Sequence, residues 1–324
     1  MKRALITGIT GQDGLYLGEL LTSKDYEVFG LVKGHDTSAR ERAQEILPDA
    51  KLLNGDLTDF ASLARALDTA QPTEVYNLAA MSFVAASWES ALLTADVTAK
   101  GVLNLLEATR QYAGSDIAKT RFCQASSSEM FGKVREVPQN EDTPLHPRSP
   151  YGVSKVFGHH MTINYRESYG MHASSGILFN HESPRRGPEF VTRKVTRAAA
   201  AISKGKQSEL VMGNIEAKRD WGFAGDYVRA MWLMLQQDTP DDYVIATGTI
   251  HSIRELLDTA FQAAGIDDWT PYLKQDPRFM RPADVDQIVG DASKAKAQLG
   301  WEPTVGFEEL ITMMVQSDLA DLER

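Results

Sequence analysis

The sequence of 324 residues predicts an α/β protein, with a doubly wound parallel sheet and a smaller, mostly C-terminal second domain. Segments typical of buried strands alternate with segments at helical spacing up to residue 180, as in a parallel sheet covered by helices on both faces. The first strand, 3–7, passes directly into a glycine-rich turn and a helix. After residue 180 a polar loop and several short elements follow, which indicates that the chain leaves the sheet there.

Composition disfavours several classes of partner. Apolar residues make up 43% of the chain and charged residues 24%, as is ordinary for a globular protein in water. The net charge of −10 argues against general binding to nucleic acid or to an anionic membrane surface. No stretch of about twenty apolar residues is present. We therefore expect no nucleic-acid partner and no membrane partner.

The only cysteine, Cys123, bears on the compartment. It lies within an apolar run and has no second cysteine to pair with, which favours a reducing compartment. We interpret Cys123 as a small buried hydrophobic residue and not as a nucleophile. The first three residues lead straight into a strand without the features of a secretory leader, so we expect a cytoplasmic protein.

The turn after the first strand predicts a dinucleotide site. Three glycines at spacings of three lie between the strand and a helical pattern at 15–21. Glycines allow a tight turn and a close approach to a pyrophosphate, while the helix N-terminus faces the phosphate charge. We expect the whole turn to contact the cofactor, namely Gly8, Thr10, Gly11, Gln12, Asp13 and Gly14.

The end of the second strand, 27–32, should meet the ribose of the adenosine. An acidic residue at this place suits NAD, and a cation suits NADP. The residue that follows the strand is Lys33, with no acid immediately after it. The pattern favours NADP, with NAD as the alternative, and Lys33 itself has the alternative interpretation of a solvated loop lysine.

The third and fourth strands add further expected cofactor contacts. Asp56 follows the third strand and is expected to meet the adenine, with Leu57 beside it. Asp59 has the alternative role of capping a helix that begins near residue 60. The fourth strand, 74–80, ends in residues that leave room for the cofactor, namely Leu78, Ala79 and Ala80.

The remaining elements follow from local patterns. The sequence predicts helices at 94–109, from 150 to beyond 165, from 190 to 197, and at 228–237, 253–264, 292–299 and 307–319. It predicts strands at 120–125, 173–179, 210–214 and 243–247. The strand at 120–125 delivers 126–129 to its carboxyl end, the edge where open parallel sheets bind ligands.

A tyrosine and a lysine four residues apart, Tyr151 and Lys155, begin the helix that follows Ser149 and Pro150. Residues four apart share a helix face, and a nearby ammonium favours the phenolate form of a tyrosine. Such a tyrosine can take a proton from an alcohol as hydride leaves the carbinol carbon. The alternative is a solvated pair on a helix surface.

Several long stretches have the pattern of a known enzyme family. They are 5–14 (LITGITGQDG), 124–132 (QASSSEMFG), 147–155 (PRSPYGVSK), 164–170 (NYRESYG), 176–187 (GILFNHESPRRG), 190–194 (FVTRK) and 219–227 (RDWGFAGDY). On these stretches the chain resembles the extended short-chain dehydrogenases, and among them the GDP-mannose 4,6-dehydratase family. The resemblance covers essentially the whole length. It implies a Rossmann domain that binds NAD(P), at 1–180 plus about 221–247, and a GDP-sugar domain, at about 181–220 plus 248–324.

The resemblance implies a redox-neutral dehydration with four catalytic residues. Tyr151, assisted by Lys155, would take the C4 hydroxyl proton of GDP-mannose while hydride passes from C4 to NADP. Ser127 would hydrogen-bond near O4. Glu129 would remove the C5 proton and help expel the C6 hydroxyl as water, after which hydride returns to C6. A solvated loop carboxylate is the alternative for Glu129. No metal is expected.

The resemblance also implies binding residues. The expected substrate contacts are Ser82, Glu129, Asn180, Val191, Lys194, Arg219 and Arg281, and the further cofactor contacts are Ser82, Tyr151, Lys155, His181 and Arg186. The cations among the substrate contacts suit two phosphates, although each has the alternative of a surface residue that aids solubility. His181 has the alternative of a structural histidine that bonds a loop carbonyl.

The chain departs from the family pattern at two places. Lys33-Gly34-His35-Asp36 stands where many relatives have an arginine-rich run that serves NADP and a neighbouring subunit. Phe83 stands where a histidine is common. The resemblance implies a homo-oligomer, namely a dimer through helices at 94–109 and 154–169, with a tetramer as a further alternative.

Two other functions are compatible with parts of the sequence. An epimerase or reductase that acts on a GDP-hexose would share the oxidation step but would not be expected to keep Glu129. A dinucleotide-binding sensor without catalytic activity would share the fold, although such proteins usually lose the tyrosine or the lysine.

Overall fold

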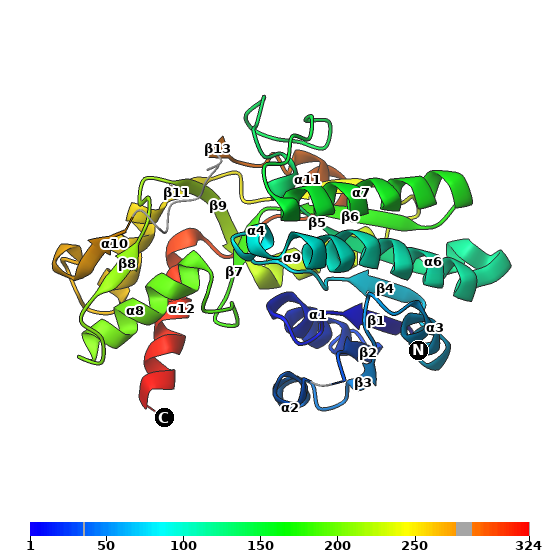
Figure 1. Ribbon diagram of the computed structural model, residues 1–324, viewed down its shortest axis with the longest axis horizontal. Helices are drawn as coiled ribbons and strands as arrows, with labels where there is room; N and C mark the ends of the chain where they lie inside the picture. The colour runs from blue at the N-terminus through cyan, green and yellow to red at the C-terminus, as the bar shows by residue number, and fades with distance from the viewer. Residues whose placement is uncertain (35, 277–286, 324) are drawn as a thin grey trace.

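A computed structural model shows two lobes, a larger one that holds the central sheet and a smaller one built from helices and short strands (Figure 1). It describes residues 1–34, 36–276 and 287–323. The N-terminus lies in the larger lobe, and the last helix, α12, lies in the smaller lobe (Figure 1). No helix within the described ranges is both long enough and apolar enough to cross a membrane.

The larger lobe is organised around a parallel sheet. Within the described residues it has seven strands in the order β10-β6-β5-β4-β1-β2-β3, and each neighbouring pair is parallel. The strands are β1 (Arg3–Thr7), β2 (Glu27–Val32), β3 (Lys51–Asn54), β4 (Glu74–Asn77), β5 (Arg121–Ser127), β6 (Ala173–Leu178) and β10 (Asp242–Ile245). The order reverses between β1 and β4, and the crevice at such a point is where doubly wound sheets bind ligands. The predicted fold class is confirmed.

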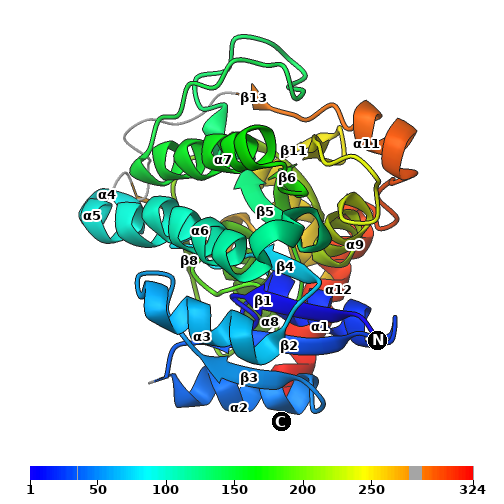
Figure 2. The same cartoon turned by 90° about the vertical axis from the view of Figure 1, so that its right-hand side faces the viewer.

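Helices cover both faces of this sheet, as Figure 2 shows for α1 and α9 on one side and α3 and α6 on the other. Apolar residues of α1 and α9 share one core, and those of α3, α6 and α7 share a second core across the sheet. The helical segments of the larger lobe are α1 (Gln12–Thr22), α2 (Thr37–Ile46), α3 (Phe60–Ala70), α4 (Ala86–Glu89), α5 (Ala91–Thr94), the π-helix η1 (Ala95–Lys100), α6 (Gly101–Ala113), η2 (Gly114–Lys119), η3 (Ser128–Met130), α7 (Pro150–Tyr169), α9 (Ala224–Met234) and α11 (Ser293–Leu299).

The smaller lobe has a hydrophobic core of its own. Val195 of α8, Leu257 of α10 and Met314 of α12 pack together in it. A buried ion pair between Arg193 and Asp318, 2.8 Å, joins α8 to α12. The elements are β7 (Asn180–Glu182), α8 (Val191–Ser203), β8 (Leu210–Met212), β9 (Lys218–Phe223), β11 (Ile250–Ser252), α10 (Ile253–Ala263), η4 (Thr270–Tyr272), β12 (Leu273–Gln275), β13 (Gln287–Ile288) and α12 (Phe307–Glu323).

The fourth strand ends earlier than the sequence predicts. The prediction was 74–80, whereas β4 stops at Asn77. The Thr7 hydroxyl accepts hydrogen bonds from the backbone N–H groups of Leu78 and Ala79, both at 3.1 Å. These two N–H groups therefore cannot pair with a neighbouring strand, and the chain turns across the end of β1.

The helix predicted at 94–109 is also different. Helical structure begins earlier, in α4 and α5, and reaches α6 through the π-helix at 95–100. Side-chain periodicity does not distinguish a π-turn from an α-turn over one or two turns, so the π-helix inside the predicted range was not expected.

Short strands of the smaller lobe were missed by the sequence analysis. The residues at 180–187 were expected to form a loop, yet β7 pairs in parallel with β9 in the register Asn180↔Trp221. β9 in turn pairs with β11 and β13. These strands contain charged residues and are separated by long stretches of chain, so that no local pattern predicts them.

The buried carboxylate of Asp220 fastens β9 to the segment after β10. It accepts hydrogen bonds from the backbone N–H and the hydroxyl of Thr247, at 2.9 and 2.6 Å, and from the N–H of Gly248 at 2.9 Å. A more distant N–H of Gly290 lies at 3.4 Å. Burial raises the pKa of Asp220, although these donors lower it.

Replacement of Asp220 should therefore destabilise the fold. We expect Asp220→Ala to lower the free energy of unfolding by about 3 kcal/mol, because it leaves buried N–H groups without an acceptor. Urea unfolding followed by circular dichroism measures the change. Asp68→Ala, at an exposed position of α3, is the matched control and should change stability by less than about 0.5 kcal/mol. Equal stability of the two variants would contradict this role of Asp220.

Candidate functional site

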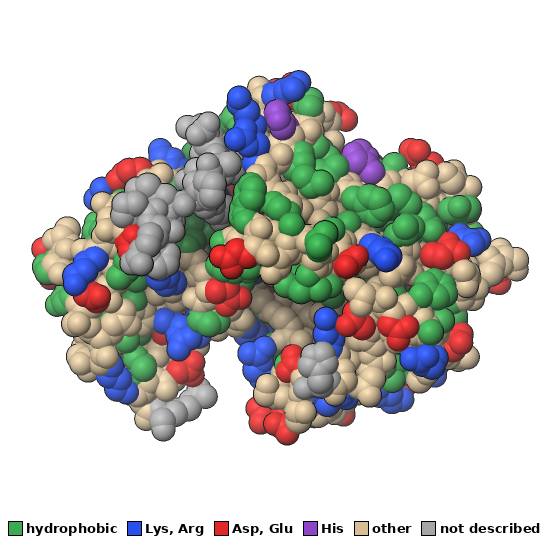
Figure 3. Space-filling view, in the orientation of Figure 1, with side chains coloured by type: hydrophobic (Ala, Val, Ile, Leu, Met, Phe, Trp, Pro, Cys, Tyr) green, Lys and Arg blue, Asp and Glu red, His purple; other side chains and the backbone are tan. Residues whose placement is uncertain are grey.

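A cavity of about 910 Å³ lies at the carboxyl edge of the sheet, where the smaller lobe faces the larger one. The space-filling view is hollowed between the two lobes (Figure 3). The cavity brings together every predicted site residue in the described part of the chain. These are Gly8, Thr10, Gly11, Gln12, Asp13, Gly14, Lys33, Asp56, Leu57, Leu78, Ala79, Ala80, Ser82, Ser127, Glu129, Tyr151, Lys155, Asn180, His181, Arg186, Val191, Lys194 and Arg219. Arg281, also predicted to bind substrate, lies outside the described residues, as does His35.

The glycine-rich turn connects β1 to α1 at one end of this cavity. Gly8 has a φ of +71°, and a Cβ there would lie 2.9 Å from the backbone nitrogen of Ala79. A Cβ on Gly14 would lie 2.3 Å from the Gly8 carbonyl oxygen. Side chains at these positions are excluded by the backbone. Gly11 is the N-cap of α1 and has no side chain that could accept a hydrogen bond. The backbone N–H groups of the first turn therefore receive no side-chain acceptor from the cap.

A partly buried ion pair ties this turn to the segment that enters the smaller lobe. The His181 Nε2 lies 2.9 Å from the Asp13 carboxylate, and its Nδ1 lies 2.7 Å from the Phe179 carbonyl. The Gln12 amide donates to the His181 carbonyl at 3.0 Å and accepts from the Ser183 hydroxyl at 2.7 Å. The structural alternative for His181, a bond to a loop carbonyl, is confirmed, and the same ring also lines the cavity.

The pKa values of this pair shift in opposite directions. Burial alone would raise the pKa of Asp13, but His181 and Gln12 lower it to about 2. Burial alone would lower the pKa of His181, but the Asp13 carboxylate raises it above its ordinary value. His181 is therefore stabilised as the cation beside an ionised Asp13.

Three cationic side chains lie around the end of β2, namely Lys33, Arg40 and Arg42. Lys33 forms an ion pair with Asp56 at 3.2 Å, and the other oxygen of that carboxylate accepts from the backbone N–H of Thr58 at 2.9 Å. Arg42 donates to the Thr10 carbonyl at 2.8 Å, and Arg40 bonds the Asn54 side chain. The arginines were not among the predicted site residues, because a helix surface with two arginines has no distinctive spacing.

Asp59 has the capping role that was its alternative. Its carboxylate accepts from the Ala61 N–H at 3.0 Å, at the start of α3.

Tyr151 and Lys155 lie on the first two turns of α7, which begins where Ser149 and Pro150 predict. The Ser149 hydroxyl accepts the Gly152 N–H at 3.0 Å. Tyr151 is 7% exposed and Lys155 is 4% exposed, so the alternative of a solvated surface pair is wrong. The Lys155 ammonium donates to the Ala125 carbonyl at 2.6 Å and lies 5.6 Å from the centre of the Tyr151 ring.

The pKa of Tyr151 differs from the sequence expectation. Burial raises it to about 12; the hydrogen bond from Ser127 lowers it, and the Glu129 carboxylate raises it. Burial also lowers the pKa of Lys155 to about 8. Burial therefore has the largest effect on the pKa of Tyr151, while the Lys155 ammonium is bonded to a backbone carbonyl.

Ser127 and Glu129 follow β5 at the same wall of the cavity. The Ser127 hydroxyl accepts the Glu129 N–H at 3.3 Å and caps the single turn η3. A Cβ on Gly152 would lie 2.8 Å from the Glu129 carbonyl oxygen, so that a glycine at this position lets α7 approach the Glu129 segment closely. Glu129 is half-buried in the cavity wall and is not a fully solvated loop carboxylate.

The smaller lobe contributes the far end of the cavity. Arg219 is buried, and its guanidinium donates to the Lys218 carbonyl at 2.7 Å; the Lys194 ammonium donates to the Val211 carbonyl at 2.6 Å. The alternative of a solvent-exposed solubility residue is therefore wrong for Arg219. Several lining residues were not among the predicted site residues, namely Met212, Asn214, Trp221 and Ile253. Trp221 lies in β9, a strand that was not predicted, and the other three carry no motif that marks a site.

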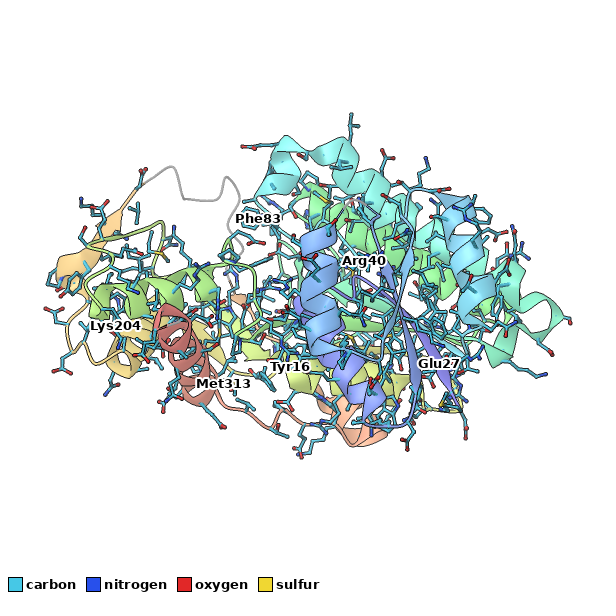
Figure 4. All side chains as sticks on the ribbon, turned by 90° about the horizontal axis from the view of Figure 1, so that it is seen from below. Tyr16, Glu27, Arg40, Phe83, Lys204 and Met313 are labelled. Atoms are coloured by element: carbon cyan, nitrogen blue, oxygen red, sulfur yellow. The ribbon has the colours of Figure 1, made fainter. Side chains whose placement is uncertain are left out.

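An aromatic contact joins the two lobes beside the cavity. Phe83, on the larger lobe, meets Phe190, which precedes α8, edge to face at 5.8 Å between ring centres. The Arg186 guanidinium stacks over the Phe190 ring at 3.5 Å. Figure 4 shows Phe83 on the side of the larger lobe that faces the smaller one. The departure at Phe83 thus places an apolar ring in the cavity wall, where it contacts the other lobe.

Comparisons with known proteins agree with this arrangement. A model of the family described as GDP-mannose 4,6 dehydratase matches residues 5–314. The chain is 54% identical to GDP-mannose 4,6 dehydratase 1 of Arabidopsis thaliana, over 98% of this chain and 90% of the relative. It is 48% identical to GDP-mannose 4,6-dehydratase of Vibrio cholerae, over 100% and 95%. The solved UDP-glucose 4-epimerase of Thermus thermophilus, in complex with NAD, is 30% identical with a TM-score of 0.84 over 98% of both chains.

The ion pair of Asp13 and His181 predicts a pH-dependent contribution to stability. Because the folded-state pKa of His181 lies above its ordinary value, its contribution is complete below about pH 6.5 and is lost as the pH rises through the folded-state pKa. Asp13, with a pKa of about 2, stays ionised throughout. We expect His181→Asn to lower the free energy of unfolding by about 3 kcal/mol at pH 6, and by less at pH 9.

Urea unfolding of wild type and variant at both pH values measures this difference. His160→Asn, at an exposed position of α7, is the control and should show no such pH dependence. A loss from His181→Asn that grows toward pH 9 would contradict the assigned protonation.

Proposed function

The chain belongs to the GDP-mannose 4,6-dehydratase family, and we propose that it converts GDP-mannose to GDP-4-keto-6-deoxymannose and water. One observation carries the proposal. The carboxylate of Glu129 lies in the same cavity wall as Tyr151 and Ser127, so that an acid–base group is added to the pair that suffices for oxidation. Eliminating water needs this additional group.

We assign the cofactor to the larger lobe, 1–180 plus about 221–247, and the GDP-sugar to the smaller lobe, about 181–220 plus 248–324. Within the last range, α11 packs against the larger lobe. The glycine-rich turn fits a dinucleotide, because Gly8 and Gly14 carry no side chains and a pyrophosphate could approach the backbone of the turn closely. When bound, the nicotinamide would accept hydride and later return it. NADP is the proposed form, with NAD as the alternative, and the cations around the end of β2 support this choice.

The chain's own residues move the protons. Tyr151, assisted by Lys155, takes the O4 proton while the C4 hydride leaves, and the charge of Arg186 offsets part of the burial that opposes the phenolate. Ser127 holds O4 by a hydrogen bond. The resulting ketone acidifies the C5 proton, which Glu129 removes and passes to the C6 hydroxyl as it leaves as water. Hydride enters at C6, and Tyr151 returns its proton to C5, so that atoms and electrons balance.

The other predicted contacts take up the nucleotide parts. Lys194 and Arg219 supply positive charge for the diphosphate in a protein whose net charge is −10, with Asn180 and Val191 beside them. We assign Ser82, which lines the same cavity, to both the cofactor and the sugar. We propose a cytoplasmic enzyme, which the single Cys123 supports, since it has no second cysteine with which to form a disulfide within the chain.

Replacement of Glu129 tests the proposed function. Wild type with GDP-mannose and a trace of NADP should yield a sugar nucleotide lighter by one water, measured by mass spectrometry. Glu129→Gln should reduce this rate by about 10²- to 10⁴-fold, because it removes the acid–base group. Oxidation at C4 should persist and appear as absorbance of the reduced cofactor.

Glu136→Gln, at an exposed position in the loop after β5, is the matched control and should retain the wild-type rate. Full dehydration by Glu129→Gln, or unchanged GDP-mannose with folded and cofactor-loaded wild type, would overturn the proposal. A change of configuration without loss of water would instead identify an epimerase.

We also propose a homodimer through the outer face of the helices α4 to α7. Apolar side chains gather on this side of the larger lobe (Figure 3), and Leu92 is 86% exposed. Trp88, Leu93, Val153 and Phe157 are also exposed there. Beside them is a groove of about 460 Å³ between Trp88 and the start of α7. A two-helix layer with an apolar outer face suits an isologous four-helix contact. A tetramer remains the further alternative.

Sedimentation velocity tests the dimer. The double variant Leu92→Asp/Phe157→Asp should shift the wild-type dimer toward monomer, because it places charges in an apolar contact. Val137→Asp, at an exposed loop position outside these helices, should sediment as wild type does. A monomeric wild type, or a dimer unaffected by the double variant, would contradict this interface.

A further inference from the structure

One face of α7 is fastened to the end of β5 at three successive turns. Tyr151, Lys155 and His159 are spaced by four residues, which places them on one helix face. The Lys155 ammonium donates to the Ala125 carbonyl, the His159 Nδ1 lies 3.0 Å from the hydroxyl of Ser126, and Ser127 lowers the pKa of the Tyr151 phenol. Three consecutive residues of the strand therefore each have a partner on this face.

The third contact has no part in the proposed reaction. His159 is 6% exposed and Ser126 is 3% exposed, so solvent does not compete for their hydrogen bond. Burial lowers the pKa of His159, as do His160 and Arg166, while Asp242 of β10 raises it. The neutral ring is therefore favoured, and its Nδ1 shares one hydrogen bond with the Ser126 hydroxyl.

Ser126 directly precedes the segment that carries two of the catalytic residues. Ser126 precedes Ser127, and the chain leaves the sheet after Ser127 into the short turn that holds Glu129. The last ladder partner of β5 is Leu178, opposite Ser127. Glu129 has no place in that ladder, so its distance from Tyr151 depends on how the end of β5 sits against α7.

We propose that His159 is a positioning residue, which holds Ser126 and thereby sets the distance of Ser127 and Glu129 from Tyr151. The inference rests on the proposed function, because it concerns the geometry of that reaction. Misplacement of reacting groups by about 1 Å costs on the order of 100-fold in rate. A purely structural histidine would affect folding, and not the reaction of the folded enzyme.

The test compares three variants of the full chain. We expect His159→Leu to lower kcat about 10- to 100-fold, with KM for GDP-mannose and the affinity for NADP unchanged within about twofold. His159→Asn, which puts an amide acceptor near the place of Nδ1, should recover most of kcat. Ser126→Ala should lose as much as His159→Leu, and the double variant should lose no more than either single one.

Ser154→Ala is the matched control. This hydroxyl lies on the same helix but bonds the Pro150 carbonyl within α7, at 2.8 Å, and its removal should leave kcat unchanged. Folded His159→Leu with wild-type kcat would overturn the proposal. Additive losses of kcat in the double variant would also overturn it. The same holds for equal losses of kcat in His159→Leu and His159→Asn that are accompanied by a lowered Tm. Should His159→Leu fail to fold, Ser126→Ala decides by the same kcat criterion. A wild type without dehydratase activity would count against the proposed function instead.

Discussion

The parallel direction of the strands at the carboxyl edge is the constraint on which the site depends. Because β1, β4, β5 and β6 all end at that edge, their following segments meet there although they are far apart in sequence. The glycine turn after β1, the small residues after β4, the Ser127 segment after β5 and Asn180 after β6 line one cavity as a consequence. The smaller lobe adds the remaining wall, and the Asp13–His181 pair and the Phe83–Phe190 contact connect the two lobes.

Burial then determines the electrostatics of this edge. The same low polarity raises the pKa of Tyr151 and lowers that of Lys155, so that both groups are disfavoured in their charged forms. The Glu129 carboxylate adds to this effect on Tyr151, whereas the charge of Arg186 reduces it. When Glu129 takes up a proton, its negative charge no longer raises the pKa of Tyr151. The protonation states of the two acid–base groups in the proposed reaction are therefore coupled. Groups with opposed pKa shifts in one cavity are typical of catalytic sites.

Local patterns predicted much of this. Ser149 and Pro150 indicated the start of α7, the glycines indicated the turn, and apolar runs indicated the strands of the large sheet, because these signals act over a few residues. The π-helix at 95–100, the pairing of β7 with β9 and the contact of His159 with Ser126 were not predicted, since each depends on residues brought together by the fold. The raised pKa of Tyr151 was missed for the same reason, because the degree of burial is a property of the folded chain.

The central claim is that oxidation, elimination and reduction occur within one cavity on one sugar. GDP-mannose carrying deuterium at C4, incubated with wild type and a trace of NADP, tests it most directly. The account predicts a product that has lost one water and carries the deuterium at C6, with no net accumulation of NADPH. Loss of the deuterium to free cofactor, or retention at C4 without loss of water, would contradict it.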